Sequence, residues 1–262
     1  MKIDLRGRVY VVTGGNEGIG KGIAEAVAEC GGKVAIISRD EHDMQSVVQA
    51  IGAAGGEAFY AAADVSKNDQ MRDAFRSIVD HFGNIDGVVA NAGTNGTWAP
   101  VDELTLEDWE RTINVNLTGT FLTVHHSVPY LRDRGGGSIV IISSINGTRT
   151  FTNEGASAYA TSKAGQLAFG KMLALELAKS KIRVNILCPG GIKSNIHQKT
   201  ERDNLEAIEI PVNYPEGEIP LTAGEMGDPI DVAAMAAFLL SDLASHITGT
   251  PVWIDGGQSL LQ

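Results

Sequence analysis

A tyrosine and a lysine, four positions apart, are the side chains of this sequence best suited to proton transfer. Tyr159 and Lys163 lie in a predicted helix over residues 157–179, where this spacing places them on one face, one turn apart. A free tyrosine, with a pKa of about 10, exchanges protons poorly near neutral pH. An ammonium group about 5 Å away, at an effective dielectric constant of about 20, would stabilise the phenolate by roughly 3 kcal/mol. The pair therefore predicts a phenol with a lowered pKa that acts as acid and base.

Two serines and an asparagine supply neighbouring polar groups. A strand predicted over 139–143 runs into Ser144, which places hydroxyl groups at the carboxyl end of a central strand, where doubly wound sheets bind ligands. Because side chains alternate along a strand, Ser143 and Ser144 point to opposite faces, and one of them is expected at the site. Asn116 lies in the helical segment that precedes this strand.

Glycines are concentrated at the first strand-to-helix turn, residues 13–20. Glycine permits a sharp turn, contact of the backbone with a pyrophosphate and close helix–sheet packing, and the helix start offers free N–H groups to phosphates. The spacing is G-x-x-x-G-x-G rather than the strict fingerprint G-x-G-x-x-G, so a glycine-rich turn without a ligand is the alternative. The turn predicts cofactor contacts from Gly14, Asn16, Glu17, Gly18, Ile19 and Gly20.

The end of the second predicted strand bears on the choice between NAD and NADP. An acidic residue there usually binds the adenosine ribose of NAD, whereas the 2′-phosphate of NADP requires positive charge. This chain has Ser38 followed by Arg39, whose planar guanidinium suits a phosphate. Glu17 opposes a nearby anion, and a solvated strand-end charge is the alternative interpretation of Arg39. The sequence therefore favours NADP over NAD.

Short β-branched segments alternate with longer amphipathic segments along the chain. The short segments are almost wholly apolar, which is typical of strands covered on both faces. They lie at 9–13, 34–38, 58–62, 87–91, 139–143, 183–187 and 251–255, and the helical segments at about 18–31, 42–54, 68–82, 106–133, 157–179 and 229–242. Repeated strand–helix–strand units predict an α/β fold with a seven-stranded parallel sheet and helices on both faces.

We expect one doubly wound, Rossmann-like domain over residues 1–262. Its cofactor half is predicted at about 1–135 and its catalytic and substrate half at about 136–262. The segment at about 193–227 has three prolines, many charges and weak periodicity. A segment of that length inside a compact domain is usually a lid or binding loop, and we expect a substrate lid here.

The order of these features resembles the short-chain dehydrogenase/reductase family over nearly the whole chain. The matching motifs are Thr13-Gly14-x-x-x-Gly18-x-Gly20, Asp64-Val65, Asn91-Ala92-Gly93, Asn116, Ser144, Tyr159-x-x-x-Lys163, Pro189-Gly190 and Asp255-Gly256-Gly257. Each motif is short, but eight in this order are very specific. The resemblance implies an NAD(P)-dependent oxidoreductase that acts on CH–OH groups.

The resemblance also implies a role for each matching residue. Tyr159 would be the acid/base, Lys163 its electrostatic partner and ribose anchor, and Ser144 the group that binds the carbonyl oxygen. Asn116 would hold the water that leads protons to Lys163. The remaining implied cofactor contacts are Asp64 and Val65 at the adenine, Asn91 with Ala92 and Gly93 at the ribose, and Pro189, Gly190, Ile192 and Ser194 at the nicotinamide. Ser144 is 15 positions before Tyr159, more than the family commonly shows; the extra residues fall in the loop 147–157, which keeps Ser144 in preference to Ser143.

Composition and charge disfavour several other functions. The 21 Lys and Arg against 32 Asp and Glu give a net charge of −11, which speaks against a nucleic-acid-binding or anionic-membrane surface. The two cysteines form neither a disulfide framework nor a metal-ligand spacing, and we expect no metal. The amino terminus lacks the apolar core of a signal peptide, and the uncharged stretch 112–131 is too polar to span a bilayer. We therefore expect a cytoplasmic protein.

The predicted lid bears on the substrate. Residues 199–225 carry two basic and seven acidic side chains, and acids that face the site would repel acyl-CoA or an acidic carrier protein. The sequence favours a small neutral, hydroxylated ketone or secondary alcohol such as a sugar or polyol. The alternatives are a 3-oxoacyl thioester reductase of fatty-acid synthesis and a non-catalytic nucleotide-binding sensor or scaffold.

Two aromatic residues and two long helices complete the expectations. Trp98 and Phe151 are candidates for a substrate wall, with a subunit contact as the alternative. The resemblance implies a homotetramer, in which the helices predicted at 106–133 and 157–179 would contact other subunits.

Overall fold

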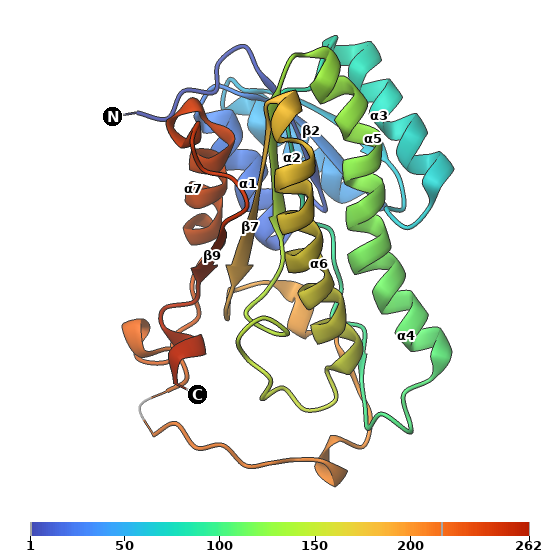
Figure 1. Ribbon diagram of the computed structural model, residues 1–262, viewed down its shortest axis with the longest axis vertical. Coiled ribbons are helices and arrows are strands. Elements are labelled where there is room, and N and C mark those ends of the chain that lie inside the picture. Colours follow the sequence, from blue (N-terminus) through green and yellow to red (C-terminus); the bar gives the residue numbers. More distant parts are fainter. Residues whose placement is uncertain (1, 216, 262) are drawn as a thin grey trace.

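Seven parallel strands form the central sheet in the computed structural model of the protein, which describes residues 2–215 and 217–261 (Figure 1). Their spatial order is β3-β2-β1-β4-β6-β7-β9. The strands are β1 (Val9–Thr13), β2 (Lys33–Ser38), β3 (Glu57–Ala62), β4 (Gly87–Ala90), β6 (Gly137–Ile142), β7 (Ile182–Pro189) and β9 (Pro251–Ile254). The predicted doubly wound parallel sheet is confirmed.

Helices cover both faces of this sheet (Figure 1). One face is covered by α1 (Gly18–Glu29), α2 (Glu41–Ala53) and α7 (Pro229–Leu240). The other is covered by α3 (Asn68–Phe82), α5 (Gly119–Asp133) and α6 (Ser157–Glu176), with α4 (Leu106–Ile113) preceding α5. The helices expected from the sequence are therefore present, and all but one begin and end within a few residues of the predicted positions.

The exception is the segment 106–133, which is not one continuous α-helix. A π-helical turn, Asn114–Thr118, separates α4 from α5. At this turn the carbonyl of Asn116 accepts hydrogen bonds from Thr120 Oγ1 at 2.7 Å and from Gln166 Nε2 at 2.9 Å. The second donor belongs to α6, so the irregularity depends on a contact between helices that hydrophobic periodicity does not report.

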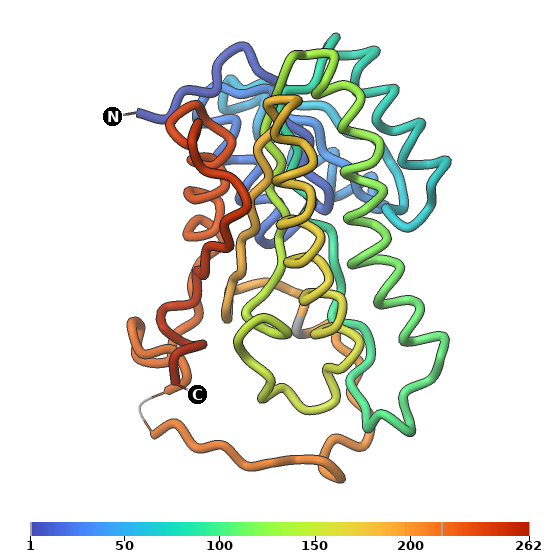
Figure 2. Tube along the Cα trace, in the orientation of Figure 1, coloured from blue at the N-terminus to red at the C-terminus, as the bar shows by residue number. Residues whose placement is uncertain are grey.

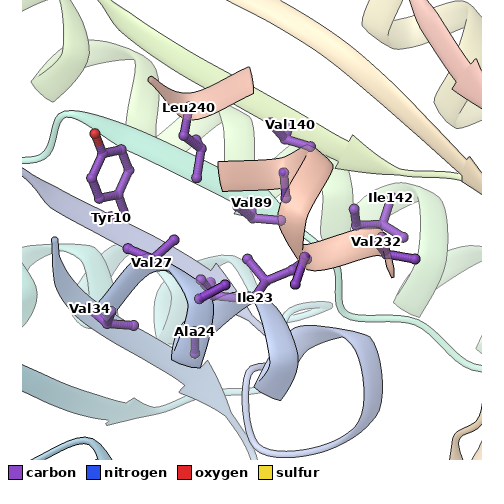
Figure 3. Packing of buried hydrophobic residues seen from close by; sticks show 14 of the residues in the cluster. Tyr10, Ile23, Ala24, Val27, Val34, Val89, Val140, Ile142, Val232 and Leu240 are labelled. Carbon is purple, nitrogen blue, oxygen red and sulfur yellow. The ribbon is translucent and has the colours of Figure 1, made fainter. Parts of the chain in front are cut away.

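The strands are apolar because successive side chains enter two different cores. In β1, Val12 packs with α1 and α7, whereas its neighbour Val11 packs with α3 and α5. Figure 3 shows the first of these cores, in which Ile23 and Val27 of α1 meet Val232 of α7. A strand buried on both faces cannot alternate apolar with polar residues, which explains the uninterrupted apolar segments of the sequence.

The order of the strands creates a crevice at one edge of the sheet. β1 pairs with β2 on one side and with β4 on the other, so the chain winds outward from β1 through β2 to β3 and then crosses back to β4 on the opposite side of β1. Ligands of open α/β sheets bind at such a switch point, outside the carboxyl ends of the strands. The glycine turn follows β1 at this edge, and the Asn91-Ala92-Gly93 segment follows β4.

The predicted lid, residues 193–227, lies at the same end of the molecule, where Figure 2 shows it as an orange arch. It contains short 3-10 turns at Asn195–His197, Leu205–Ala207 and Pro220–Thr222. Its strand β8 (Glu201–Arg202) pairs in parallel with β5 (Thr97–Trp98), which follows β4. Within residues 2–215 and 217–261, no helix combines the length and the hydropathy that a membrane crossing requires.

We predict that Ile23→Ala destabilises the protein through the packing of α1 against α7. Ile23 is fully buried, so the truncation leaves a cavity and lowers the free energy of unfolding by about 2–5 kcal/mol. Urea denaturation measures this change. Ile230→Ala is the control. Ile230 lies on α7 and is 54% exposed, so its truncation should change stability by less than about 0.5 kcal/mol. Equal losses in the two variants would contradict the packing described here.

Candidate active site

A cavity of about 300 Å³ opens at the carboxyl ends of β1, β4, β6 and β7. The loops after these strands line it, together with the start of α6 and the first residues of the lid. The residues expected from the sequence that line it are Gly14, Asn16, Glu17, Gly18, Ile19, Gly20, Arg39, Asp64, Val65, Asn91, Ala92, Gly93, Trp98, Ser144, Tyr159, Lys163, Pro189, Gly190, Ile192 and Ser194. Arg39 follows β2, and Asp64 with Val65 follows β3, so residues from six separate strand ends meet at one place.

Three residues expected at the site do not line this cavity: Ser38, Asn116 and Phe151. Ser38 is the last residue of β2, and the chain enters the cavity only with the next residue, Arg39. Phe151 lies in a surface loop with 75% of its side chain exposed, so the structure does not support it as a substrate wall. Asn116 is fully buried behind the cavity wall.

Two glycines of the turn are required by the backbone itself. Gly14 has φ +64°, in the left-handed region where glycine is favoured. A Cβ atom at Gly20 would lie 2.1 Å from the carbonyl oxygen of Gly14, which no side chain tolerates. Asn91 Nδ2 donates to the carbonyl oxygens of Thr13 at 3.0 Å and of Gly14 at 3.2 Å, and this fastens the turn to the end of β4. The backbone is thus exposed to the cavity, as contact with a phosphate requires.

Lys163 is the most deeply buried charged group of the site. Only 4% of the residue is exposed, and Nζ donates a hydrogen bond to the carbonyl of Ile142 at 3.0 Å. Nζ lies 5.6 Å from the centre of the Tyr159 ring. Burial disfavours the ammonium form and lowers the pKa of Lys163 to about 8, so most molecules still carry the charge at neutral pH.

Tyr159, at the start of α6, is half-buried and faces Ser144. Burial raises the pKa of its phenol, and a hydrogen bond from the Ser144 hydroxyl lowers it in part. The expected net lowering of this pKa is therefore not present in the protein alone. The physical reason is that the desolvation of a phenolate outweighs its stabilisation by Ser144 in this half-buried position.

The two serines after β6 have different surroundings. Ser143 Oγ donates to the backbone carbonyl of Lys163 at 2.8 Å and so fastens the end of β6 to α6. Ser144 Oγ accepts from the backbone N–H of Asn146 at 3.1 Å and reaches Tyr159. This difference favours Ser144 for a role in the chemistry and gives Ser143 a structural one.

Asn116 engages all of its polar groups with neighbouring residues. Its Nδ2 donates to the carbonyl of Thr94 and to Ser162 Oγ, both at 2.9 Å, and its Oδ1 accepts from the N–H of Thr94 at 2.8 Å. An added Cβ at Gly93 would lie 3.3 Å from Asn116 Oδ1 and 3.6 Å from Lys163 Nζ. Asn116 therefore holds the loop after β4 close to Lys163, although it does not itself reach the cavity.

Sequence reasoning missed a group of amide side chains at the cavity. They come from five places in the chain: Asn95, Asn146, Asn153, Asn195 and Gln258. Two of them, Asn146 and Asn153, have side-chain amides that bond no other residue in 2–215 or 217–261, whereas Gln258 Oε1 accepts from the N–H of Gly191 at 2.9 Å. Such residues are common in loops, and no spacing in the sequence indicates that these five converge.

The charge of the lid at the cavity differs from the expected one. None of the lid acids in the described ranges lines the cavity, and Glu216 lies outside those ranges. The lid instead contributes Lys199, which pairs with Glu17 of the glycine turn. Glu201, 61% exposed, pairs with Arg111 at 2.8 Å outside the cavity. The expected repulsion of anionic substrates by lid acids thus finds no support in this arrangement.

Comparisons with known proteins agree with this geometry. A family model described as enoyl-(acyl carrier protein) reductase matches residues 14–259. The chain is 38% identical to 3beta-hydroxysteroid dehydrogenase 1 of Eggerthella lenta, over 98% of this chain and 95% of that protein. It is 35% identical to glucose 1-dehydrogenase 2 of Bacillus subtilis, over 98% of this chain and 96% of that protein. The crystal structure of a 3-ketoacyl-ACP reductase from Sinorhizobium meliloti superposes with a TM-score of 0.94 and 50% identity, covering 97% of this chain and 100% of that one.

We predict that the burial of Lys163 makes stability depend on pH in the alkaline range. Because its pKa is about 8 in the folded protein and near 10.5 when unfolded, the unfolded state binds more protons between these values. The free energy of unfolding of the wild type, relative to Lys163→Met, should therefore rise by roughly 1–2 kcal/mol from pH 8 to pH 10. Urea denaturation at several pH values measures it. Parallel curves for the two proteins would contradict the assigned burial of the charge.

Proposed function

The chain belongs to the short-chain dehydrogenase/reductase family, whose members are NAD(P)-dependent oxidoreductases of CH–OH and carbonyl groups, and we propose that it interconverts a ketone and a secondary alcohol on a small, neutral, hydroxylated substrate. The observation that carries the proposal is the meeting of Tyr159, Ser144 and Lys163 at one cavity. Tyr159 faces a hydroxyl donor on one side and a buried ammonium group on the other.

The cavity fits a nicotinamide dinucleotide at its glycine-lined end. A Cβ at Gly20 would meet the carbonyl oxygen of Gly14, so only glycine lets the turn pack this closely against the start of α1. Glycines of this turn line the cavity, and the first N–H groups of a helix suit a pyrophosphate. We assign the adenine to Asp64 and Val65, and the adjacent ribose to the segment 91–93. The segment from Pro189 to Ser194, after β7, would then hold the nicotinamide near Tyr159.

In the direction of reduction, Ser144 donates a hydrogen bond to the carbonyl oxygen and Tyr159 transfers its phenolic proton to that oxygen. The hydride for the carbonyl carbon would come from a reduced nicotinamide held by the segment after β7. Lys163 stabilises the phenolate left behind, and a water or hydroxyl group brings the next proton to it. In the direction of oxidation the phenolate of Tyr159 takes the proton from the alcohol, so the same groups serve both directions.

Asn116 contributes to the proposed site by holding neighbouring residues in place. Its hydrogen bonds hold Thr94 and the loop after β4, which carries Gly93 next to the ammonium group of Lys163. Its carbonyl already accepts two side-chain hydrogen bonds, so a bound water there would have to share that oxygen. We therefore assign Asn116 to the positioning of Lys163 and of the loop, in place of the expected role of holding the water that leads protons to Lys163.

The lining of the substrate end supports a hydroxylated substrate. The amides of Asn146 and Asn153 are free to donate to and accept from hydroxyl groups, and Trp98 adds an apolar wall that is 7% exposed. One of the relatives, glucose 1-dehydrogenase 2, is named for a sugar substrate, which is a substrate of this class.

A 3-oxoacyl thioester reductase is the second candidate. Two observations favour it: Lys199 lines the cavity in place of the lid acids, and the 3-ketoacyl-ACP reductase of Sinorhizobium meliloti shares half of its residues with this chain. An anionic carrier would meet less repulsion here than the composition of the lid suggests.

Arg39 supports a preference for NADP. It lines the cavity, is exposed, and makes no ion pair with a residue in the described ranges, so its guanidinium is available to a 2′-phosphate. Ser38, which stands where NAD-binding sheets often carry an acid, removes a source of repulsion.

We also propose a homotetramer. Large apolar side chains on α4, α5 and α6 are exposed in the single chain and suit a subunit contact: Leu106, Phe121, Met172 and Leu175. The expected cytoplasmic location stays a prediction.

Turnover of a panel of carbonyl compounds with NADPH tests the function. We expect a hydroxylated ketone to be reduced faster than an acyl-carrier thioester, and the reverse order would select the second candidate. Tyr159→Phe should lower kcat at least about a hundredfold, because it removes the proton donor, and leave the Kd of NADPH nearly unchanged. Tyr130→Phe, on α5 outside the cavity, is the control. Retained turnover in Tyr159→Phe would end the acid/base assignment.

The cofactor preference is tested by Arg39→Ala. The loss of a charge-assisted bond to the 2′-phosphate should raise KM for NADP by roughly tenfold and leave KM for NAD unchanged. Steady-state kinetics with both cofactors measures the two values. Arg76→Ala, an exposed arginine of α3, controls for the loss of positive charge in general. An unchanged ratio of the two KM values in Arg39→Ala would exclude this role.

A further inference from the structure

A carboxylate stands at the phosphate end of the cofactor cavity. Glu17 is the N-cap residue of α1, directly before Gly18, and its side chain is 39% exposed at the cavity. The start of a helix attracts anions through its free N–H groups and its dipole. A carboxylate there occupies the same favourable field as a pyrophosphate and repels it, so this residue opposes the cofactor that the rest of the turn fits.

The lid supplies a positive charge to this carboxylate. Lys199 Nζ pairs with Glu17 Oε1, and Asn195 Nδ2 lies 3.4 Å from Glu17 Oε2. Both lid residues also line the cavity. The partners are 182 positions apart in the chain, and the pair is one of the contacts by which the lid meets the glycine turn.

We propose that Lys199 is a cofactor-binding residue, which neutralises Glu17 and so allows the phosphates of a nicotinamide dinucleotide to bind at the start of α1. This inference rests on the proposed binding of such a cofactor. Without Lys199, the unpaired carboxylate faces the two negative charges of the pyrophosphate across a cavity that is open to them. With Lys199 in place, its ammonium group balances the charge of the Glu17 carboxylate. The free N–H groups at the start of α1 can then attract the phosphates of the cofactor.

The same segment of the lid is fastened to the substrate end of the cavity. Thr200, the next residue, accepts a hydrogen bond from Asn95 Nδ2 at 2.8 Å, and β8 then pairs with β5, which carries Trp98. The N–H of Asp203 donates to the carbonyl of Trp98 at 3.0 Å. Lys199 therefore stands between the cofactor turn and the wall that Trp98 forms, so the placement of one depends on the other.

A double-mutant cycle on equilibrium binding tests the proposal. Binding of NADPH is followed by its fluorescence, without turnover, in the wild type, Glu17→Gln, Lys199→Met and the combined variant. We expect Lys199→Met to raise the Kd about fivefold at low salt, as for a partly exposed charge, and the combined variant to return to within about twofold of the wild type. The effect of Lys199→Met should shrink at roughly 0.5 M salt, since screening weakens the repulsion.

Lys193→Met is the matched control. Lys193 lies in the same lid, pairs with Asp228 at 3.1 Å and does not line the cavity, so its removal should leave the Kd within about twofold of the wild-type value. An unchanged Kd in Lys199→Met, or a combined variant that binds as weakly as Lys199→Met, would overturn the proposal. If the wild type binds no nicotinamide nucleotide, the proposed function fails; if all four proteins bind NADPH equally, only this inference fails.

Discussion

A single buried ammonium group connects the fold of this protein to its chemistry. Lys163 lies almost wholly out of solvent on α6, and its ammonium group donates a hydrogen bond to the carbonyl at the end of β6. A charge in such a place is costly unless it is hydrogen-bonded, and the lowered pKa of about 8 is the sign of that cost. The same low-polarity surroundings make its attraction for a phenolate stronger than it would be in water. Under the proposed function, Tyr159, one helical turn away, depends on this charge when it gives up its proton.

The surrounding loops hold this charge in place through hydrogen bonds. Ser143 ties the end of β6 to the backbone of Lys163, and Asn116 ties the loop after β4 to α6 through Ser162. The π-helical turn belongs to the same arrangement, because Gln166 of α6 reaches the carbonyl of Asn116. Three elements that are distant in the sequence are thereby locked around one side chain, and small changes at any of them would move the ammonium group.

Much of the fold could be predicted from the sequence because a parallel sheet buried on both faces leaves a simple pattern. Uninterrupted apolar segments such as 34–38 appear only where both faces of a strand are covered, and the positions of the strands were predicted to within one or two residues. The irregularity at Asn114–Thr118 could not be predicted, because periodicity over 106–133 is that of a continuous helix and the cause lies in α6. Phe151, expected as a substrate wall, is exposed and does not line the cavity. The sequence of a loop does not indicate which way its side chains turn.

The sequence by itself determined the candidate reacting groups and their local geometry. Tyr159 and Lys163 share a helix face, and the glycine turn follows β1, because both relations depend only on spacing within one element. The tertiary structure alone decided which groups from different loops meet. It placed Ser144 rather than Ser143 beside the phenol and gathered five amides from four segments of the chain. It also set Lys199 against Glu17, whereas no lid acid in the described ranges lines the cavity. Spacing along a chain controls neighbours on one helix or strand, whereas contacts between loops depend on how the whole sheet is ordered.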